Sequence, residues 1–432
     1  MTTGSTEAPK KPASTFAALR HRDFRMLWAG QTLSAIGDPI FPFAIAFWSI
    51  ENNRGASGIG AVFAARALAV VATVVVGGVF ADRLPRRQVM IAADVIRAIA
   101  ILSIVIAPGN FSIWYLSTLV FVVGLGESLF RPAFRAIMPA LLPPEDLQQG
   151  NSLTSATNKI ANLAGPALAG LLVATVGVRQ SLIVTAATFL CSVLTLLWVR
   201  EPKRVRETTE QPSILREAKE GLVAVLERRW IALETVAAML QLSLSVAPWI
   251  VLLPIVAAGR GDNQEAIYST LLITMGVGSF VGALAGGRLK PRQPGLVASL
   301  ALLPFSAVLV ALALPTPFLI LVALQFLAGV GVEIYTILWT TAVQNDVPDS
   351  LLGRVFAFDE LGSRALLPLG MVLVGSLADQ WGAAAILVVA ATINGVTAVA
   401  PLVLPDVRAF SSRRRVGRHR APEGAAARQP VS

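Results

Sequence analysis

Long apolar stretches, separated by short polar turns, run through the whole 432-residue chain. A helix needs roughly 20 consecutive, mostly apolar residues to cross a bilayer. Twelve stretches reach that length, at residues 24–50, 57–81, 88–107, 113–135, 154–176, 179–199, 230–258, 266–287, 294–314, 317–342, 356–380 and 383–404. Runs of Gly, Pro, Asn and charged residues lie between them, as turns require. The pattern predicts an all-α integral membrane protein with twelve transmembrane helices.

The composition narrows the class of protein further. Hydrophobic residues make up 55% of the chain and charged residues only 14%, whereas a soluble domain carries about 25% charged residues. This balance excludes a soluble globular domain and a disordered chain. A single cysteine excludes a disulfide framework and a cysteine-based metal site.

The distribution of basic residues predicts the orientation in the membrane. With the N-terminus in the cytoplasm, 29 of the 36 basic residues lie in cytoplasmic segments, and only Arg54, Arg179 and Arg260 lie on the other side. This positive-inside bias places both termini in the cytoplasm. Residues 1–19 have no apolar core of a signal peptide, so the first helix is expected to stay in the protein. The net charge of +10 then faces anionic lipid headgroups and requires no nucleic acid.

The segment after the sixth stretch divides the chain into two halves. Residues 200–229 form the longest connection, and apolar residues at helical spacing within 213–229 predict an amphipathic helix on the cytoplasmic surface. After a shift of 205 residues, positions 124–177 align with 329–382 without a gap, and five glycines meet glycines. We therefore expect a tail (1–23), a six-helix bundle (24–199), a linker (200–229), a second six-helix bundle (230–404) and a basic tail (405–432). Such parallel repeats place a substrate site at the midplane between the halves.

The loop between the second and third stretches carries a spaced motif made of Gly78, Asp82, Arg83, Arg86 and Arg87. It resembles the G-x-x-x-D-R-x-G-R-R/K motif of the major facilitator superfamily, with Pro85 in place of a glycine. A positive-inside loop would explain the arginines but not Asp82. The resemblance implies that the Asp82 carboxylate latches the cytoplasmic gate in one state. Its partners would be Arg131, Arg135 and the helix N-terminus near Arg354.

A second set of motifs resembles one branch of that superfamily. Gly165, Pro166 and Gly170 resemble part of the motif of exporting, antiporter-type members, although small residues at these positions also suit helix packing. Residues 19–38, 131–139, 151–153 and 352–370 look like the enterobactin-exporter and macrolide-efflux branch. The resemblance implies the major facilitator fold, with two pseudo-symmetric six-helix bundles. It also implies export of drug-like or siderophore-like small molecules.

Ionisable residues inside the predicted spans are candidates for the site, because a charge at the centre of a span costs roughly 2.5–3.5 kcal/mol on insertion scales. Asp94 with Arg97, and Glu360 with Arg364, are spaced to neutralise each other on one helix. Asp359 lies near the cytoplasmic end, where water can solvate it. The candidates that remain for proton binding or substrate contact are Asp38, Glu127, Glu333, Arg66 and Lys159. Structural ion pairs among them are the alternative.

These patterns favour a secondary active transporter that exports its substrate by alternating access. No lysine follows the glycine pattern of a nucleotide-binding loop, so protons are the expected coupling ion. We expect a monomer in the bacterial cell membrane that binds a small molecule and lipids, has no cofactor or metal and is not an enzyme. The alternatives are uptake of a small metabolite, or a transporter-like sensor or scaffold that moves nothing.

Overall fold

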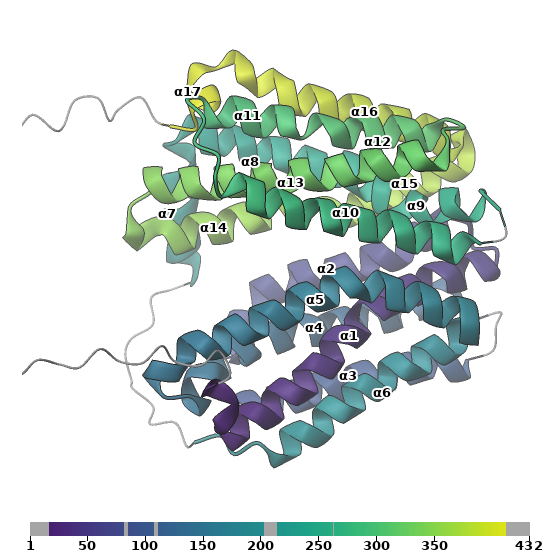
Figure 1. Cartoon of the computed structure of the whole chain (residues 1–432), viewed down its shortest axis with the longest axis vertical. Coiled ribbons are helices and arrows are strands. Elements are labelled where there is room, and N and C mark those ends of the chain that lie inside the picture. The colour runs from purple at the N-terminus through teal and green to yellow at the C-terminus, as the bar shows by residue number, and fades with distance from the viewer. Residues whose placement is uncertain (1–16, 82–84, 108–110, 203–213, 262, 412–432) are drawn as a thin grey trace, which may run out of the picture.

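The computed structural model describes residues 17–81, 85–107, 111–202, 214–261 and 263–411. Within these ranges the chain contains helices and turns and no strand. Twelve segments are long and apolar enough to cross a membrane, as the sequence predicted. Figure 1 shows two helical bundles side by side, with the first residues of α1 and the helix α17 at the same end of the molecule.

The first bundle contains six membrane-spanning helices after a short 3₁₀ turn, η1 (Ala17–Arg20). They are α1 (Arg22–Glu51), α2 (Gly55–Ala81), α3 (Arg86–Ile106), α4 (Ile113–Leu141), α5 (Pro144–Val176) and α6 (Val178–Trp198). Helix α5 starts ten residues before the predicted apolar stretch, because polar residues 144–153 extend it beyond the apolar region. We call this bundle the N half.

The second bundle, the C half, also crosses the membrane six times, but three of its crossings are divided and the last one ends in a 3₁₀ turn, η3. Its elements are α8 (Arg229–Gln241), η2 (Leu242–Val246), α9 (Ala247–Ala258), α10 (Gln264–Gly286), α11 (Pro294–Ala301), α12 (Leu303–Ala313), α13 (Phe318–Asp346), α14 (Asp349–Arg364), α15 (Leu367–Trp381), α16 (Ala383–Val399), η3 (Ala400–Val403) and α17 (Pro405–Ala409). Each break falls just before Pro248, Pro304 or Pro368. Proline lacks the N–H that would continue the helix.

Glycines at matching positions set the helix crossings in both halves. A Cβ atom on Gly124 of α4 would lie 2.8 Å from the Cβ of Ala69 on α2. At the matching position of the C half, a Cβ atom on Gly329 of α13 would lie 2.1 Å from the carbonyl oxygen of Met275 on α10. Only glycine permits so close an approach of two backbones. The repeat seen in the sequence therefore has the same packing role in each half, which confirms the predicted pseudo-symmetry.

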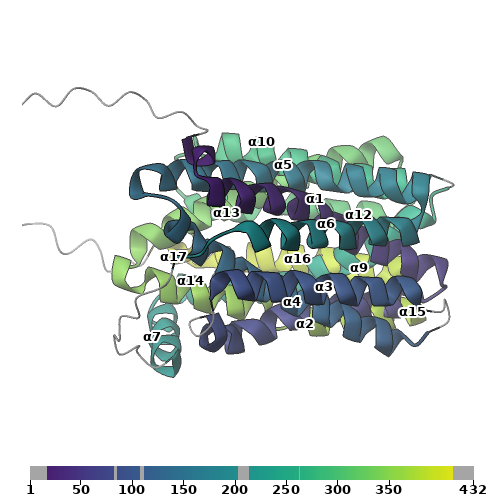
Figure 2. The same cartoon turned by 90° about the horizontal axis from the view of Figure 1, so that it is seen from below.

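The outer surface is apolar, as a bilayer requires. Large hydrophobic side chains are exposed on the outer faces of several spans, among them Ile99, Leu171, Leu194, Phe280, Leu319 and Leu327. In water such a surface would be an aggregation hazard. In lipid it is the favourable contact, and the helices hold their own backbone hydrogen bonds. The two views together place the spans roughly parallel to one another (Figures 1 and 2).

The helix predicted within the linker is present as α7 (Ile214–Leu226). It packs against α14 at the end of the molecule where α1 starts. The Glu220 carboxylate pairs with the Arg354 guanidinium at 2.5 Å, and Gly221 lies directly against the Arg354 backbone. Helix α7 is therefore attached to the C half through α14.

Candidate functional site

A cavity of about 840 Å³ lies between the halves, mostly against the N half. Its lining runs from Trp28 in the second turn of α1, Met138 near the end of α4 and Asn151 near the start of α5 to Pro42 and Phe43 deeper in α1. The C half contributes Tyr268 and Leu272 of α10. We call the end of the molecule that carries the start of α1 and α17 the open end, because the cavity lining extends toward it.

Aromatic rings form the floor of the cavity. The ring of Phe43 lies 5.0 Å from that of Phe47 and 4.8 Å from that of Tyr268, measured between centroids. All three side chains are buried. Because Tyr268 comes from α10, this cluster joins the two halves beneath the cavity.

Beyond the floor, the halves meet directly at what we call the closed end. A Cβ atom on Gly375 of α15 would lie 2.5 Å from the Ala56 carbonyl oxygen on α2, and one on Gly170 of α5 would lie 2.7 Å from the Cβ of Ser269 on α10. The Asp379 carboxylate of α15 also accepts hydrogen bonds from the backbone N–H groups of Ala56 (2.9 Å) and Ser57 (3.1 Å). A carboxylate at a helix N-terminus is stabilised by the helix dipole. The closed end is therefore held by backbone contact and one charge–dipole interaction.

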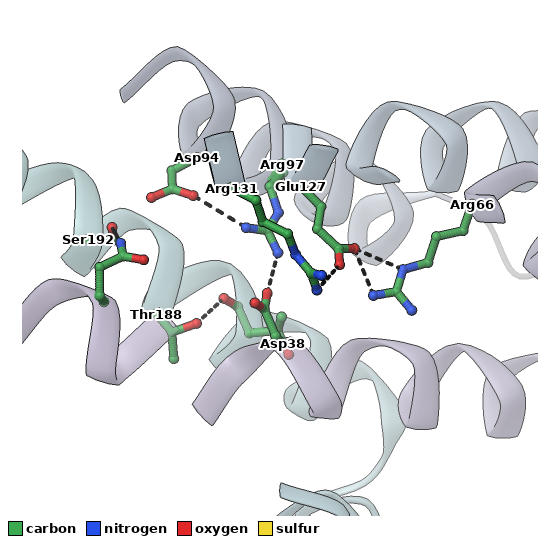
Figure 3. Close-up of polar contacts among 10 residues, drawn as sticks. Asp38, Arg66, Asp94, Arg97, Glu127, Arg131, Thr188 and Ser192 are labelled. Carbon is green, nitrogen blue, oxygen red and sulfur yellow. Dashed lines mark hydrogen bonds and ion pairs between the residues drawn. The ribbon is translucent and has the colours of Figure 1, made fainter. Parts of the chain in front are cut away.

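Asp38 has a partner that the sequence did not predict. The Arg97 guanidinium of α3, whose side chain is 5% exposed, forms an ion pair with the Asp38 carboxylate of α1 and a second one, at 3.4 Å, with Asp94 on its own helix. The ring of Phe189 lies 3.7 Å from the same guanidinium carbon. The ion-pair alternative therefore applies to Asp38, with Arg97 as its partner, because Arg97 takes a carboxylate from a second helix in addition to its neighbour Asp94 (Figure 3).

Glu127 joins two arginines across two helices. Its carboxylate accepts hydrogen bonds from Arg66 of α2 at 2.7 Å and from Arg131 of α4 at 2.7 Å (Figure 3). The Glu127 side chain is 11% exposed, whereas that of Arg131 is 69% exposed. Asp38, Arg66, Glu127, Arg131 and Arg135 all line the cavity. The predicted ion-pair alternative therefore applies to Glu127, and it leaves Arg131 facing the cavity.

Two other candidates lie outside the cavity. Lys159 of α5 is exposed and does not line it, and Glu333 of α13 is partly buried near Gly282 of α10. Within the part of the chain that the structure describes, neither side chain forms an ion pair or a hydrogen bond. The structure thus brings Asp38, Glu127 and Arg66 together and leaves these two apart from them.

A polar stripe on α5 completes the cavity wall, and the sequence reasoning missed it. Asn151, Ser155, Asn158 and Asn162 line the cavity at intervals of four, three and four residues, which puts them on one helix face. The same spacing is readable in the sequence. Amides and hydroxyls here give the wall hydrogen-bond donors and acceptors opposite the aromatic floor.

Only part of the motif at the end of α2 lies within the described residues. Asp82 and Arg83 lie outside the described residues, so the latch stays a prediction, and Gly78 lies in the last turn of α2. The Glu201 carboxylate accepts from the backbone N–H groups of Arg86 (3.3 Å) and Arg87 (3.0 Å) at the start of α3. The Arg87 guanidinium donates to backbone carbonyl oxygens at the end of α6. Both contacts satisfy helix termini.

The antiporter-like residues have packing contacts in this conformation. A Cβ atom on Gly165 would lie 2.4 Å from the ring of Pro39 on α1, Pro166 lines the cavity, and Gly170 meets α10 at the closed end. The packing interpretation of these glycines therefore accounts for their positions. One of the contacts, that of Gly170, joins the two halves.

Comparison with known proteins defines the class. The model of a family described as transmembrane secretion effector, within the major facilitator superfamily, matches residues 13–427. Macrolide efflux protein A of Streptococcus pyogenes is 26% identical over 368 residues, which cover 83% of this chain and 90% of that protein. The multidrug efflux pump Tap of Mycolicibacterium fortuitum is 26% identical over 377 residues, with 83% and 89% covered.

Solved structures agree on the fold. The crystal structure of the nucleoside transporter NupG aligns with a TM-score of 0.70 and 14% identity, covering 88% of this chain and 98% of that one. The family model and the efflux relatives identify a multi-pass membrane transporter rather than an enzyme, and the twelve candidate spans agree with that class. The chain belongs to the transmembrane secretion effector family of the major facilitator superfamily.

The pairing of Glu127 with Arg66 gives a prediction for stability. Glu127→Gln leaves the Arg66 charge without its carboxylate in a partly buried position, so we expect a loss of roughly 3 kcal/mol of stability. Adding Arg66→Met should recover much of that loss. The measurement is a double-mutant cycle on the thermal unfolding of purified protein in detergent. A loss in the double variant equal to the sum of the losses in Glu127→Gln and Arg66→Met alone would show that the two side chains do not act as a pair.

Proposed function

We propose that the protein exports amphipathic, drug-like or siderophore-like small molecules by alternating access, with protons as the coupling ion. The observation that carries the proposal is a cavity that is open toward one end of the molecule and closed at the other. Its volume lies within the range of roughly 300–1,000 Å³ that is common for small-molecule sites. The efflux relatives support export in preference to uptake.

The chemistry of the wall favours an amphipathic substrate. Arg131 and Arg135 place positive charge at the open side, the α5 stripe supplies amides and hydroxyls, and Phe43 and Tyr268 form an apolar floor. A molecule with one polar and one apolar face would satisfy both surfaces. In this proposal Asp38, Arg66 and Glu127 hold the wall through ion pairs while their exposed edges contact the substrate. A closed, uncharged interior would instead favour a scaffold that moves nothing.

We place the open end in the cytoplasm, so the conformation described here is the inward-open state of an exporter. The support is the bias of 29 basic residues toward the segments at that end. In the opposite state the open end would close, and Asp82 would then act as the latch.

Orientation is tested by labelling single cysteines in intact cells. With Cys191→Ser as background, Asn263→Cys lies at the closed end and Glu227→Cys at the open end, and both positions are exposed. A membrane-impermeant maleimide should label Asn263→Cys in intact cells, and Glu227→Cys only after the cells are broken. Labelling of Glu227→Cys in intact cells would reverse the orientation and make the open state outward-facing.

Export is tested with erythromycin, ethidium and enterobactin as probes in cells that lack their major efflux pumps. Cells that express the wild type should accumulate less of at least one probe, and dissipating the proton gradient should abolish the difference. Asp38→Asn keeps the shape of the side chain but weakens its ion pair with Arg97, and it should lower export several-fold. Lys159→Gln is the matched control, since Lys159 lies outside the cavity. Equal accumulation with and without the wild type for all probes would contradict export of these classes.

A further inference from the structure

A second buried carboxylate lies in the C half, outside the cavity wall. The Glu234 side chain on α8 is 4% exposed. Its Oε2 atom accepts a hydrogen bond from the Tyr335 hydroxyl of α13 at 3.0 Å. Asp359 of α14 lies close enough to act on it electrostatically, and Asp359 itself accepts from the Thr235 hydroxyl at 2.8 Å. We call Glu234 and Asp359 the acid pair.

Neither member of the acid pair forms an ion pair with a cation among the described residues. Arg364, the basic residue that acts on Asp359, pairs with Glu360 at 2.5 Å instead. Arg228, which precedes α8 at its N-cap position, pairs with Asp346 of α13. The elements packed around α8 carry the following charged or titratable side chains: Asp349, Arg354, Asp359, Glu360 and Arg364 on α14, Glu333, Tyr335 and Asp346 on α13, the described Glu220 on α7, and Asp406 and Arg408 on α17. Arg354 pairs with Glu220. The elements η2, η3 and α16 carry none.

The carboxylates of the two halves differ in the groups that surround them. Each carboxylate of the N-half site is held by a guanidinium, so protonating Asp38 or Glu127 would break an ion pair. Glu234 has only a neutral hydroxyl donor and a neighbouring acid. A buried carboxyl group without a cation costs less free energy when it carries a proton. Two neighbouring carboxyl groups also resist being charged at the same time.

We propose that Glu234 and Asp359 form a proton-binding site of the C half and that this site binds the coupling proton. A hydronium ion transfers its proton to a carboxylate oxygen of Glu234 and becomes water: one O–H bond of hydronium breaks and one forms on the carboxyl group. Release is the reverse, in which a water molecule takes the proton and leaves as hydronium. Asp359 is less buried than Glu234. The role in coupling rests on the proposed export, whereas the proton site itself does not.

The position of the acid pair links proton binding to the opening of the transporter. It joins α8 to α14, and α14 also contacts α2 of the N half. Loss of the proton leaves a negative charge on each side of the α8–α14 contact, one on Glu234 and one on Asp359, and their repulsion weakens that contact. Proton binding restores it. A change in the packing of α14 therefore reaches the interface between the halves.

The test reads the carboxyl group directly, without any substrate. Purified protein in lipid nanodiscs is titrated with base while infrared difference spectra record the C=O stretch of protonated carboxyl groups. The wild type should lose a buried-carboxyl band on titration, and Glu234→Gln should lack that band. Glu360→Gln is the control, because Glu360 also lies on a membrane helix but is exposed and ion-paired. The same band in wild type and Glu234→Gln would overturn the site.

A second variant keeps the proposal testable if Glu234→Gln does not fold. Tyr335→Phe removes only the hydroxyl that donates to Glu234, so the frequency of the band should shift. An unshifted band would contradict the assignment. Titrations in sodium chloride and in choline chloride distinguish a proton site from a sodium site. Loss of the band on adding sodium at fixed pH would identify a sodium site and overturn the proton site.

Transport separates this inference from the proposed function. In proteoliposomes with a proton gradient, Glu234→Gln should lose uphill accumulation of a probe that the wild type exports, while downhill exchange continues. Wild-type uphill accumulation in Glu234→Gln would overturn the coupling role. A titrating Glu234 band in a wild type that moves no probe would support the proton site and contradict export of those probes.

Discussion

Arg97 belongs to the membrane-spanning helix α3, and its side chain is almost completely buried. The arrangement of the N half follows from the need to neutralise the charge of its guanidinium. Its own helix supplies Asp94, and α1 supplies Asp38. Gly126 of α4 leaves room for the arginine, because a Cβ atom there would lie 2.5 Å from the Arg97 Cγ. Helices α1, α3 and α4 are therefore brought together around one charge. The same contact turns Asp38 toward the cavity, where its side chain remains 36% exposed.

The two halves share a fold but differ in the neighbours of their buried carboxylates. In the N half, Arg97 and Glu127 connect neighbouring helices through ion pairs and make a wall that changes little in charge. Breaking such a pair leaves an uncompensated charge in a medium that cannot solvate it. In the C half, Glu234 has a hydroxyl and a second acid as neighbours. We infer a division of work, in which the N half presents a fixed polar surface to the substrate and the C half binds the proton.

The sequence predicted the spans, the two halves and the glycine pairs because these depend on hydropathy and on local spacing. Glu360 and Arg364 were also predictable as a pair, being neighbours on one helix. Asp38 and Arg97 were not, because their contact depends on how α1 and α3 rotate against each other. For the same reason, the sequence left the Glu127–Arg66 pair as one arrangement among several. It also gave no indication that Glu234 is buried. The stripe of amides on α5 was readable from its helical period, whereas Asp379 gains its role only when α15 meets the start of α2.

Alternating access is the central claim, and paired distance measurements test it most directly. Two pairs of spin labels measure distances between the halves, each label attached to an introduced cysteine in a Cys191→Ser background. One pair is at Asn53 and Gln380 at the closed end, and the other is at Gln148 and Gly353 at the open end. All four positions are exposed. Asp379→Asn removes the charge at the α2 N-terminus, worth about 1 kcal/mol, and should raise the opposite state roughly fivefold. The account predicts that the closed-end distance lengthens while the open-end distance shortens. Distances that stay fixed, or that lengthen together, would contradict it.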